Sequence, residues 1–377
     1  MQTLPNRPNA TVRIIISDKT WLESEAVTQL ENTAKLVGME RAVGLPDLHP
    51  GKGHPIGAAF VTKGWIYPHL VGNDIGCGMG LWQTEIKANK IKLDKWAEKL
   101  GRLDAPWDGD CRAWLDERGV GATDYDVTLG TIGGGNHFAE LQKIETIYDP
   151  DACATLNLDR QALYLLVHSG SRGLGENILR THTDQYRDQG LHDTAEEAAK
   201  YLAKHDHALR WAQSNRALIA HRFIACLRTH GAPVLDIYHN TVTPQFFNGC
   251  TCWIHRKGAA PADKGVVVIP GSRGDFSYLV RPLGEQQDNA FSLAHGAGRK
   301  WKRSDAKGRL GKYRYDDFLK TPLGNTVICE DKELIYEEAP QAYKNIESVV
   351  NELVAAGLVA LVAKFRPVLT YKTRRRK

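Results

Sequence analysis

Gly133-Gly134-Gly135-Asn136-His137-Phe138-Ala139-Glu140 is a triple-glycine turn that leads into a histidine and a carboxylic acid. Three other segments share this design, because each presents a His or a Cys from a glycine turn or a predicted strand end. They are 73–78 (NDIGCG), 167–173 (VHSGSRG) and 238–240 (YHN). Glycine lets backbone segments approach closely, and strand ends hold side chains on a rigid scaffold. We therefore expect these segments to meet at one site.

Strands and helices are mixed around these segments without a regular βαβ rhythm. The glycine loops match neither GxGxxG nor GxxxxGK[ST], which disfavours Rossmann and P-loop folds. We predict an α+β fold with mixed β-sheets, surrounding helices and a metal site in a central cleft. With no repeat or long linker, residues 1–377 are expected to form one domain. Strands are predicted at 12–17, 58–67, 80–86, 162–168, 234–238, 266–269 and 358–368, and helices at 24–37, 194–227 and 342–356.

The composition is that of an ordinary globular protein. The 377 residues are 42% hydrophobic and 25% charged, with 49 basic and 44 acidic side chains and a net charge of +5. These values exclude intrinsic disorder as the main state. The charge allows an anionic partner without requiring one. The 35 glycines are more than average and are bunched in the turns described above.

The cysteine pattern indicates a reduced compartment. Seven cysteines form no regular framework, and residues 1–16 show no signal-peptide pattern. No apolar run is long enough to span a bilayer. We expect a cytoplasmic enzyme without membrane association. Cys250 and Cys252 form a CxC pair with no second pair to complete a zinc site, so structural thiols are the favoured interpretation.

Five side chains in the glycine segments could bind metal. Asp74 and Cys77 are three residues apart in one turn, and His137, His168 and His239 add three imidazoles. Such a set suits a first-row divalent ion, and manganese, cobalt and zinc all remain open. Five ligands exceed the three that one open catalytic zinc ion usually takes. A binuclear site with a bridging thiolate is therefore plausible, whereas each residue alone would more often be a buried structural group.

A candidate nucleophile stands in 292–299 (SLAHGAGR). His295 precedes a Gly-Ala-Gly turn, and a neutral imidazole can attack phosphorus. Arg299 could reach a phosphate with its guanidinium fork. The alternative is a structural histidine in a turn of small residues. The loop 270–275 (PGSRGD) could form an anion nest or a plain surface turn, and the basic residues 372–377 could form a solvated tail or bind phosphate.

The predicted helix 194–227 carries two polar residues, Asn215 and Arg222, on its apolar face. They could be hydrogen-bonded core residues or could line a cleft. The sequence leaves both possibilities open.

Together these segments make the chain resemble the RtcB family of RNA-splicing ligases over nearly its whole length. GGGNHF, HSGSRG and HGAGR in this order are highly specific. The resemblance rests on PDLHPGKGHPIG (46–57), NDIGCG (73–78), GTIGGGNHFAE (130–140), HSGSRGLG (168–175), YHN (238–240), PGS (270–272), HGAGR (295–299), EEAPQAYK (337–344) and Lys372.

The resemblance implies a reaction that joins a 2′,3′-cyclic phosphate or 3′-phosphate RNA end to a 5′-hydroxyl end, with GTP and two Mn²⁺ ions as cofactors. His295 would attack the α-phosphorus of GTP and carry GMP, which then passes to the RNA 3′-phosphate. Asp47 and Arg299 would complete the catalytic set. Asp47 would support the metals or the binding of the RNA end.

The resemblance also assigns ligands. The metal ligands would be Asp74, Cys77, His137, His168 and His239, with Cys77 bridging. The nucleotide-binding residues would be Asn136, His137, Phe138, Ala139, Glu140, His239, Asn240, Pro270, Gly271, Ser272, Arg273, Ser277, His295, Gly296, Ala297, Gly298, Tyr343 and Lys372.

The chain departs from the family's common pattern at Lys52, His54, Arg273 and Lys302, each a basic or titratable residue. These departures leave every ligand and the nucleophile in place. They suggest a divergent branch that repairs a particular broken RNA, with DNA not expected as the main substrate. A translation factor or another activating protein is a possible partner. The alternatives are a metallohydrolase that only processes RNA ends and a non-catalytic RNA-binding subunit.

Overall fold

The computed structural model describes residues 10–17, 20–101, 103–247 and 249–374. Both ends of the predicted domain 1–377 fall outside these ranges. The residues outside the described ranges include most of the stretch 1–16, for which no signal peptide is predicted, and the basic residues 375–377.

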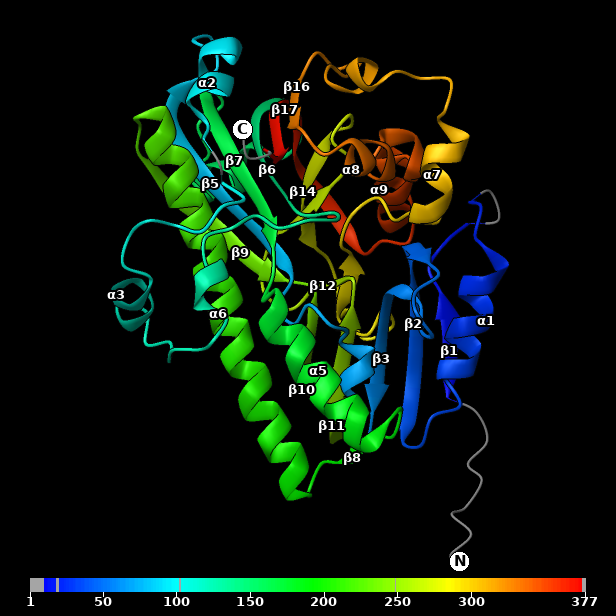
Figure 1. Ribbon diagram of the computed structural model, residues 1–377. Helices are drawn as coiled ribbons and strands as arrows, with labels where there is room; N and C mark the ends of the chain where they lie inside the picture. Colours follow the sequence, from blue (N-terminus) through cyan, green and yellow to red (C-terminus); the bar gives the residue numbers. More distant parts are fainter. Residues whose placement is uncertain (1–9, 18–19, 102, 248, 375–377) are drawn as a thin grey trace, which may run out of the picture.

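An eight-stranded sheet forms the centre of the molecule (Figure 1). Seven strands follow the order β13-β14-β17-β6-β7-β5-β9 in antiparallel pairs, and β16 pairs with β17 in parallel. The sheet therefore joins segments from most of the chain. Its strands are β5 (Gly78–Lys87), β6 (Phe138–Ile147), β7 (Ala162–Ser169), β9 (Gly231–Tyr238), β13 (Val267–Pro270), β14 (Ser277–Pro282), β16 (Thr326–Cys329) and β17 (Val359–Thr373).

Helices cover both faces of this sheet, as the alternating side chains of β7 show. Leu163 and Leu165 pack into a cluster with residues of the long helix α6 (Glu196–Leu227). Leu166 packs on the opposite face with residues of α9 (Ile346–Ala355). All eight residues of β7 are buried. A strand buried on both faces reads as a continuous apolar run, which is how ALYLLVH appears in the sequence.

The remaining elements surround this sheet. A second, five-stranded sheet has the order β1-β2-β3-β11-β10, and two short pairs join β12 to β15 and β4 to β8. These strands are β1 (Thr11–Ile14), β2 (Met39–His49), β3 (Ile56–Thr62), β4 (Trp65–Ile66), β8 (Leu191–His192), β10 (Asn240–Phe247), β11 (Cys250–Lys257), β12 (Ala259–Pro261) and β15 (Ser292–Ala294). The other helices are α1 (Ser24–Thr33), α2 (Leu93–Lys99), α3 (Cys111–Asp116), α4 (Pro150–Thr155), α5 (Gly173–Tyr186), α7 (Arg303–Arg309) and α8 (Lys332–Glu337), with short 3₁₀ turns η1 (Pro68–Leu70), η2 (Asp126–Thr128), η3 (Tyr315–Phe318) and η4 (Pro340–Ala342).

The prediction of an α+β fold with mixed sheets is confirmed. The predicted strand at 12–17 is shorter, since β1 ends at Ile14, and the predicted helices begin or end a few residues inside their expected limits. The sequence does not predict β2, β6, the β10–β11 hairpin or α5, all of which the structure contains. Across the described ranges, no helix combines the length and the apolar character that a membrane span needs.

Candidate active site

Four predicted ligands lie at one edge of the central sheet because neighbouring strands run in opposite directions. Cys77 directly precedes β5 and His137 directly precedes β6. His168 stands at the end of β7, and His239 directly follows β9. The pairing sets Gly78 opposite both Ser169 and Tyr238, and Phe138 opposite His168. In the order β6-β7-β5-β9, the start of one strand therefore meets the end of the next.

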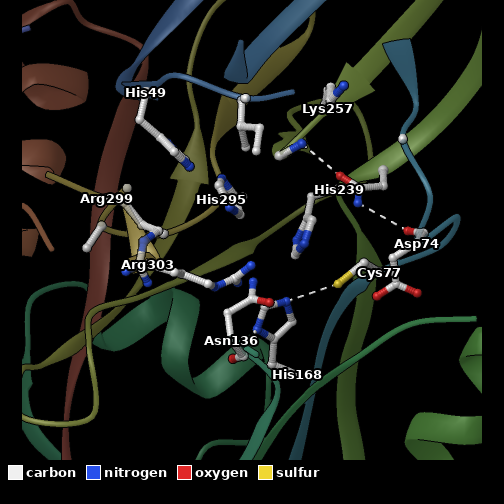
Figure 2. A pocket seen from close by; sticks show the side chains of 18 of the residues that line it. His49, Asp74, Cys77, Asn136, His168, His239, Lys257, His295, Arg299 and Arg303 are labelled. Carbon is white, nitrogen blue, oxygen red and sulfur yellow. Dashed lines mark hydrogen bonds between the residues drawn. The ribbon is translucent and has the colours of Figure 1, made fainter. Parts of the chain in front are cut away.

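The five predicted metal ligands form two groups that share a sulfur. Donor atoms of Cys77, His168 and His239 lie within 4.8 Å of one another, and so do those of Asp74, Cys77 and His137. Sγ of Cys77 is 3.1 Å from Nε2 of His168 and 3.4 Å from Nε2 of His137. Nε2 of His137 is 2.9 Å from Oδ2 of Asp74. Figure 2 shows Cys77 between His168 and Asp74.

The protonation of these groups fits a divalent ion. Burial lowers the pKa of His168 and of His239 well below the usual value, so both imidazoles are neutral and can donate a lone pair. Burial raises the pKa of the Cys77 thiol, an effect that a bound cation would reverse. Burial would raise the pKa of Asp74, but its interactions with His137 and a hydrogen bond from the backbone N–H of Arg172 outweigh burial, so this pKa is lowered. The donors are those that a first-row ion accepts.

Neighbouring groups fix the orientation of the ligands. The backbone N–H of Arg172 donates to Oδ1 of Asp74 at 2.9 Å, and its guanidinium lies 2.9 Å from Nδ1 of His137. Nδ1 of His168 is 3.2 Å from the carbonyl of Asn136. A Cβ at Gly170 would come within 2.4 Å of the Asp74 carboxylate, so only glycine fits there. Such contacts tune a metal site.

Helix α6 supports the loops of the site through hydrogen bonds. Its buried Asn215 accepts a hydrogen bond from the N–H of Gly130 and donates to Ser169 and Gly170. Arg222 donates to the carbonyls of Ala105 and Gly130. Asn215 is thus a hydrogen-bonded core residue, Arg222 is half-buried and hydrogen-bonded, and neither lines the cleft.

Arg216 of the same helix is fully buried and forms an ion pair with Asp236. It also donates to the carbonyl of Gly76, next to Cys77, and to that of Ser169, next to His168. A buried charge with all its partners in place is costly to disturb, so α6 holds the edge of the sheet rigidly.

His295 follows β15 and lies beside the metal ligands. Its Nδ1 is 2.6 Å from Oδ2 of Asp47, and its backbone N–H donates to the same oxygen at 3.1 Å. Asp47 is fully buried, and the ring centroids of His295 and His239 are 4.7 Å apart. A Cβ at Gly258 would come within 2.8 Å of the His295 ring. The structure therefore places Asp47 on the histidine and not on the metal ligands.

The end of β2, which carries Asp47, is itself anchored. Nζ of Lys344 donates to the carbonyls of Pro46 and Leu48 at 3.1 and 2.8 Å. Gly298 has φ +70°, and a Cβ there would come within 2.3 Å of the Asp47 carbonyl, so the turn after His295 also packs directly on this end of β2.

A buried carboxyl group marks the predicted guanosine side of the cleft. Glu140 accepts hydrogen bonds from Gln142 and Thr370, and burial raises its pKa to about 7. Nζ of Lys372 donates to the carbonyl of Gly135 at 2.6 Å, and burial lowers its pKa to about 8. Ser277 accepts from Gln142 behind this pair.

Arg299, which is predicted to bind a phosphate, makes its hydrogen bonds with groups of the protein. Its guanidinium donates to Glu338, Tyr343 and the carbonyls of Glu337 and Trp301. Its contact with a phosphate therefore stays a prediction. The pKa of Glu338 is lowered to about 2 despite burial, because cations surround it. Arg299 and Arg303 lie together on one side of His295, and Asp74 and Lys257 lie on the other (Figure 2).

The departures at basic residues differ in position. Arg273 is buried and donates to the carbonyls of Glu338 and Ile335, which ties the loop 270–275 to α8. His54 stacks on His69 with centroids 4.5 Å apart. Lys302 is exposed and pairs with Glu25, and Lys52 lines the cleft.

Most predicted site residues line one cleft of about 1220 Å³, which is large enough for a nucleotide and part of an RNA end. The side chain of Ala139 does not line this cleft. Strand alternation turns its side chain into the core on the α6 side, so only its backbone is left for a nucleotide. Those of the predicted residues that line the cleft are Asp74, Cys77, Asn136, Phe138, Glu140, His168, His239, Asn240, Pro270, Gly271, Ser272, Arg273, His295, Gly296, Ala297, Gly298, Arg299, Tyr343 and Lys372.

Several residues of the site were not among the predicted ones. Arg172, Glu338 and Lys344 stand inside quoted motifs, so motif membership was the available signal. His49, which lines the cleft two residues after Asp47, also stands inside a quoted motif, 46–57. Cys250 and Cys252 are free thiols whose sulfur atoms lie 3.7 Å apart, with no third ligand beside them in the described ranges.

Comparison with known proteins shows the same family throughout the chain. The profile of the family described as tRNA-splicing ligase RtcB matches residues 29–109 and 116–373. RNA-splicing ligase RtcB2 of an Escherichia coli strain is 52% identical, over 95% of this chain and 94% of the relative. RNA-splicing ligase RtcB of Escherichia coli K12 is 29% identical, over 93% and 95%. tRNA-splicing ligase RtcB of Thermococcus kodakarensis is 28% identical, over 97% and 94%.

Proposed function

Since this chain belongs to the RtcB family and is an RNA ligase, we propose that it joins a 2′,3′-cyclic phosphate or 3′-phosphate RNA end to a 5′-hydroxyl end, with GTP and two Mn²⁺ ions. One observation carries the proposal. Two metal-donor groups share Cys77, and they stand beside a histidine whose Nδ1 faces a buried carboxylate. End processing by hydrolysis would need the donors but not the histidine.

His295 is the nucleophile of the proposed first step. Because Nδ1 faces Asp47, Nε2 is the ring nitrogen left for attack on the α-phosphorus of GTP. The Nε2–P bond forms as the bond to pyrophosphate breaks, which gives a histidine–GMP intermediate. Asp47 holds the ring and stabilises the positive charge that it gains during attack.

The bound ions, held by Asp74, Cys77, His137, His168 and His239, would polarise phosphorus and neutralise charge on attacking and leaving oxygens. Mn²⁺ is part of the proposal, and the ligand types are compatible with it.

The nucleotide would lie along the side of the cleft that holds Glu140, Tyr343 and Lys372. The Glu140 carboxyl can accept hydrogen bonds from the guanine edge, and Lys372 adds a donor. Asn136 and the loops 270–273 and 296–298 would contact the phosphates through backbone and side-chain donors.

The later steps transfer GMP to RNA. An oxygen of the RNA 3′-phosphate attacks the GMP phosphorus and releases His295. The 5′-hydroxyl oxygen then attacks the RNA phosphorus, and GMP leaves. A cyclic phosphate is first opened by water. We place this chemistry in the cytoplasm, in keeping with the free thiols among the described residues; an activating protein partner belongs to the same proposal.

Labelling tests the proposal directly. With Mn²⁺ and α-labelled GTP, the wild-type protein should acquire a covalent label that His295→Ala loses while metal binding persists. RNA joining should then depend on GTP. A wild-type protein that opens cyclic phosphates without GTP, and never acquires the label, would instead be an end-processing hydrolase.

A further inference from the structure

We propose that Lys344 is a positioning residue for the nucleophile, acting on His295 through Asp47. The inference rests on the proposed role of His295. It concerns a side chain that touches neither the predicted metal ligands nor the histidine itself.

The first link is the double contact of Lys344 with the end of β2 on both sides of Asp47. Its ammonium group donates to the carbonyls immediately before and after this residue, Pro46 at 3.1 Å and Leu48 at 2.8 Å. Two hydrogen bonds from one group fix the backbone on both sides of Asp47. The direction of the Asp47 carboxylate therefore depends on Lys344.

The second link is the carboxylate itself. Oδ2 of Asp47 meets both the backbone N–H and Nδ1 of His295. Oδ1 is buried and has no hydrogen-bond partner in the described part of the chain. Oδ1 thus gives the carboxylate no further anchor, so its orientation depends on the backbone around Asp47, which Lys344 holds together with His49, whose Nδ1 lies 2.8 Å from the Asp47 carbonyl oxygen.

The third link connects the same segment to the turn after the nucleophile. The N–H of Lys344 donates to the carbonyl of Gly298 at 3.0 Å, and the N–H of Lys300 donates to that of Ala342 at 2.7 Å. Arg299 and Tyr343 pair between these two bonds. Tyr343 lines the nucleotide side of the cleft, and its chain neighbour Lys344 reaches the end of β2 that carries Asp47. One short segment thus supports both the nucleotide pocket and the nucleophile.

Lys344 has the chemistry for this role. It is half-buried, and burial lowers the pKa of its amine to about 8. The nearby carboxylates of Asp47 and Glu23 favour its charged form. The ammonium group can donate three hydrogen bonds, and the two carbonyls take two of them. Methionine keeps the length of the side chain but donates none.

The test is guanylylation of purified full-length protein with GTP and Mn²⁺. Lys344→Met should lower the rate at saturating GTP about 10- to 100-fold, since small misplacements of reacting groups have effects of this size. The KM for GTP should change less than threefold. Lys344→Arg, which keeps two donors, should recover most of the rate. Lys264→Met, at an exposed lysine far along the chain, is the matched control.

A double-mutant cycle separates positioning from general damage. If Lys344 acts through Asp47, adding Lys344→Met to Asp47→Asn should cause little further loss, because coupled residues are not additive. Independent, multiplying losses would overturn the inference. So would a rate for folded Lys344→Met within twofold of wild type, or a raised KM with an unchanged rate at saturation.

A spectroscopic readout needs no ligase activity. The imidazole ¹⁵N signals of His295, assigned by comparison with His295→Ala, should report one dominant tautomer in the wild type. They should report a mixture in Lys344→Met, or in Lys344→Gln if the first variant does not fold. Identical tautomer ratios in wild type and variant would overturn the inference. Absence of GTP labelling in the wild type would count against His295 as nucleophile and leave this measurement valid.

Discussion

At the scale of single residues, the site depends on groups that orient other groups. Arg172 holds Asp74, Asp47 holds His295, and each works through contacts below 3.2 Å. Their effects on activity should therefore exceed their effects on stability.

Asp47→Asn tests the contact with the nucleophile. The amide has the same shape but no charge and can present N–H to the ring, which would favour the wrong tautomer. By analogy with other acid–histidine pairs, enzyme–GMP formation should fall by about two to four orders of magnitude. Labelling kinetics measure this fall, with melting temperature and metal content as controls. A loss of less than tenfold would argue against the orienting role.

Glu140 gives the free protein a pH-dependent stability. Burial raises its folded-state pKa from 4.5 to about 7, so the folded protein binds this proton more tightly than the unfolded chain. Its contribution is fully present below about pH 4.5 and is lost as the pH rises through 7. The free energy of unfolding of Glu140→Gln should therefore exceed that of the wild type by an amount that grows from pH 5 to pH 8, up to roughly 3 kcal/mol. The melting temperature of the variant should be higher by a correspondingly growing amount. Calorimetry from pH 5 to pH 8 measures this change, and a difference in stability that is the same at every pH would contradict the raised pKa of Glu140.

At the scale of elements, the site lies at an edge of the central sheet, where the ends of four strands meet and helix α6 packs against the sheet. Such an arrangement tolerates no extra atoms between the strands. Gly170, after β7, lies against the Asp74 carboxylate, whereas Gly134, in the turn before β6, has open space where a Cβ would be.

Gly170→Ala should displace Asp74 and weaken metal binding at least about tenfold, the lower end of what lost supporting contacts cost a metal site. Gly134→Ala is the matched control and should bind as wild type does. Titration with Co²⁺, followed by the thiolate charge-transfer band, measures both. Equal affinities for the two variants would show that the edge can rearrange.

Helix α6 makes its own contribution through Asn215. Asn215→Ala leaves the N–H of Gly130 and the carbonyl of Gly170 without this partner, and such losses cost about 1–3 kcal/mol. Urea unfolding should show this loss. Gln213→Ala, on the exposed side of the same helix, should be nearly neutral. A similar loss for both would mean that helix propensity, not the hydrogen bonds, is responsible.

The sequence predicts the ligands because each stands in a glycine turn or at a predicted strand end. The sequence does not predict β6, since Phe138–Ile147 mixes apolar and charged residues and pairs with β7 and with the distant β17. Nor could it find that Asp47 meets His295, 248 residues away. Long-range contacts of this kind leave no local periodicity.

At the scale of the whole molecule, metal binding should stabilise the fold. The ligands come from four strands and one loop, so an ion bound only by the folded chain stabilises it through mass action. At 100-fold excess over Kd, each site adds about 2.7 kcal/mol. Adding Mn²⁺ to chelator-treated protein should raise the melting temperature, and amide exchange should slow at residues 73–78 and 136–140. Cys77→Ala, which removes the shared donor, should lose most of this shift. An equal shift in Cys77→Ala would mean that the ions bind elsewhere.

Strand β17 pairs with β6, β14 and β16, and its Lys372 reaches the nucleotide side of the cleft. During translation this segment is made after nearly all the others described. A nascent chain that stops before Val359 lacks a central strand and leaves the edges of β6 and β14 open to other chains. Premature termination before Val359 would thus yield an aggregation-prone product without ligase activity, and a working enzyme requires synthesis beyond Thr373.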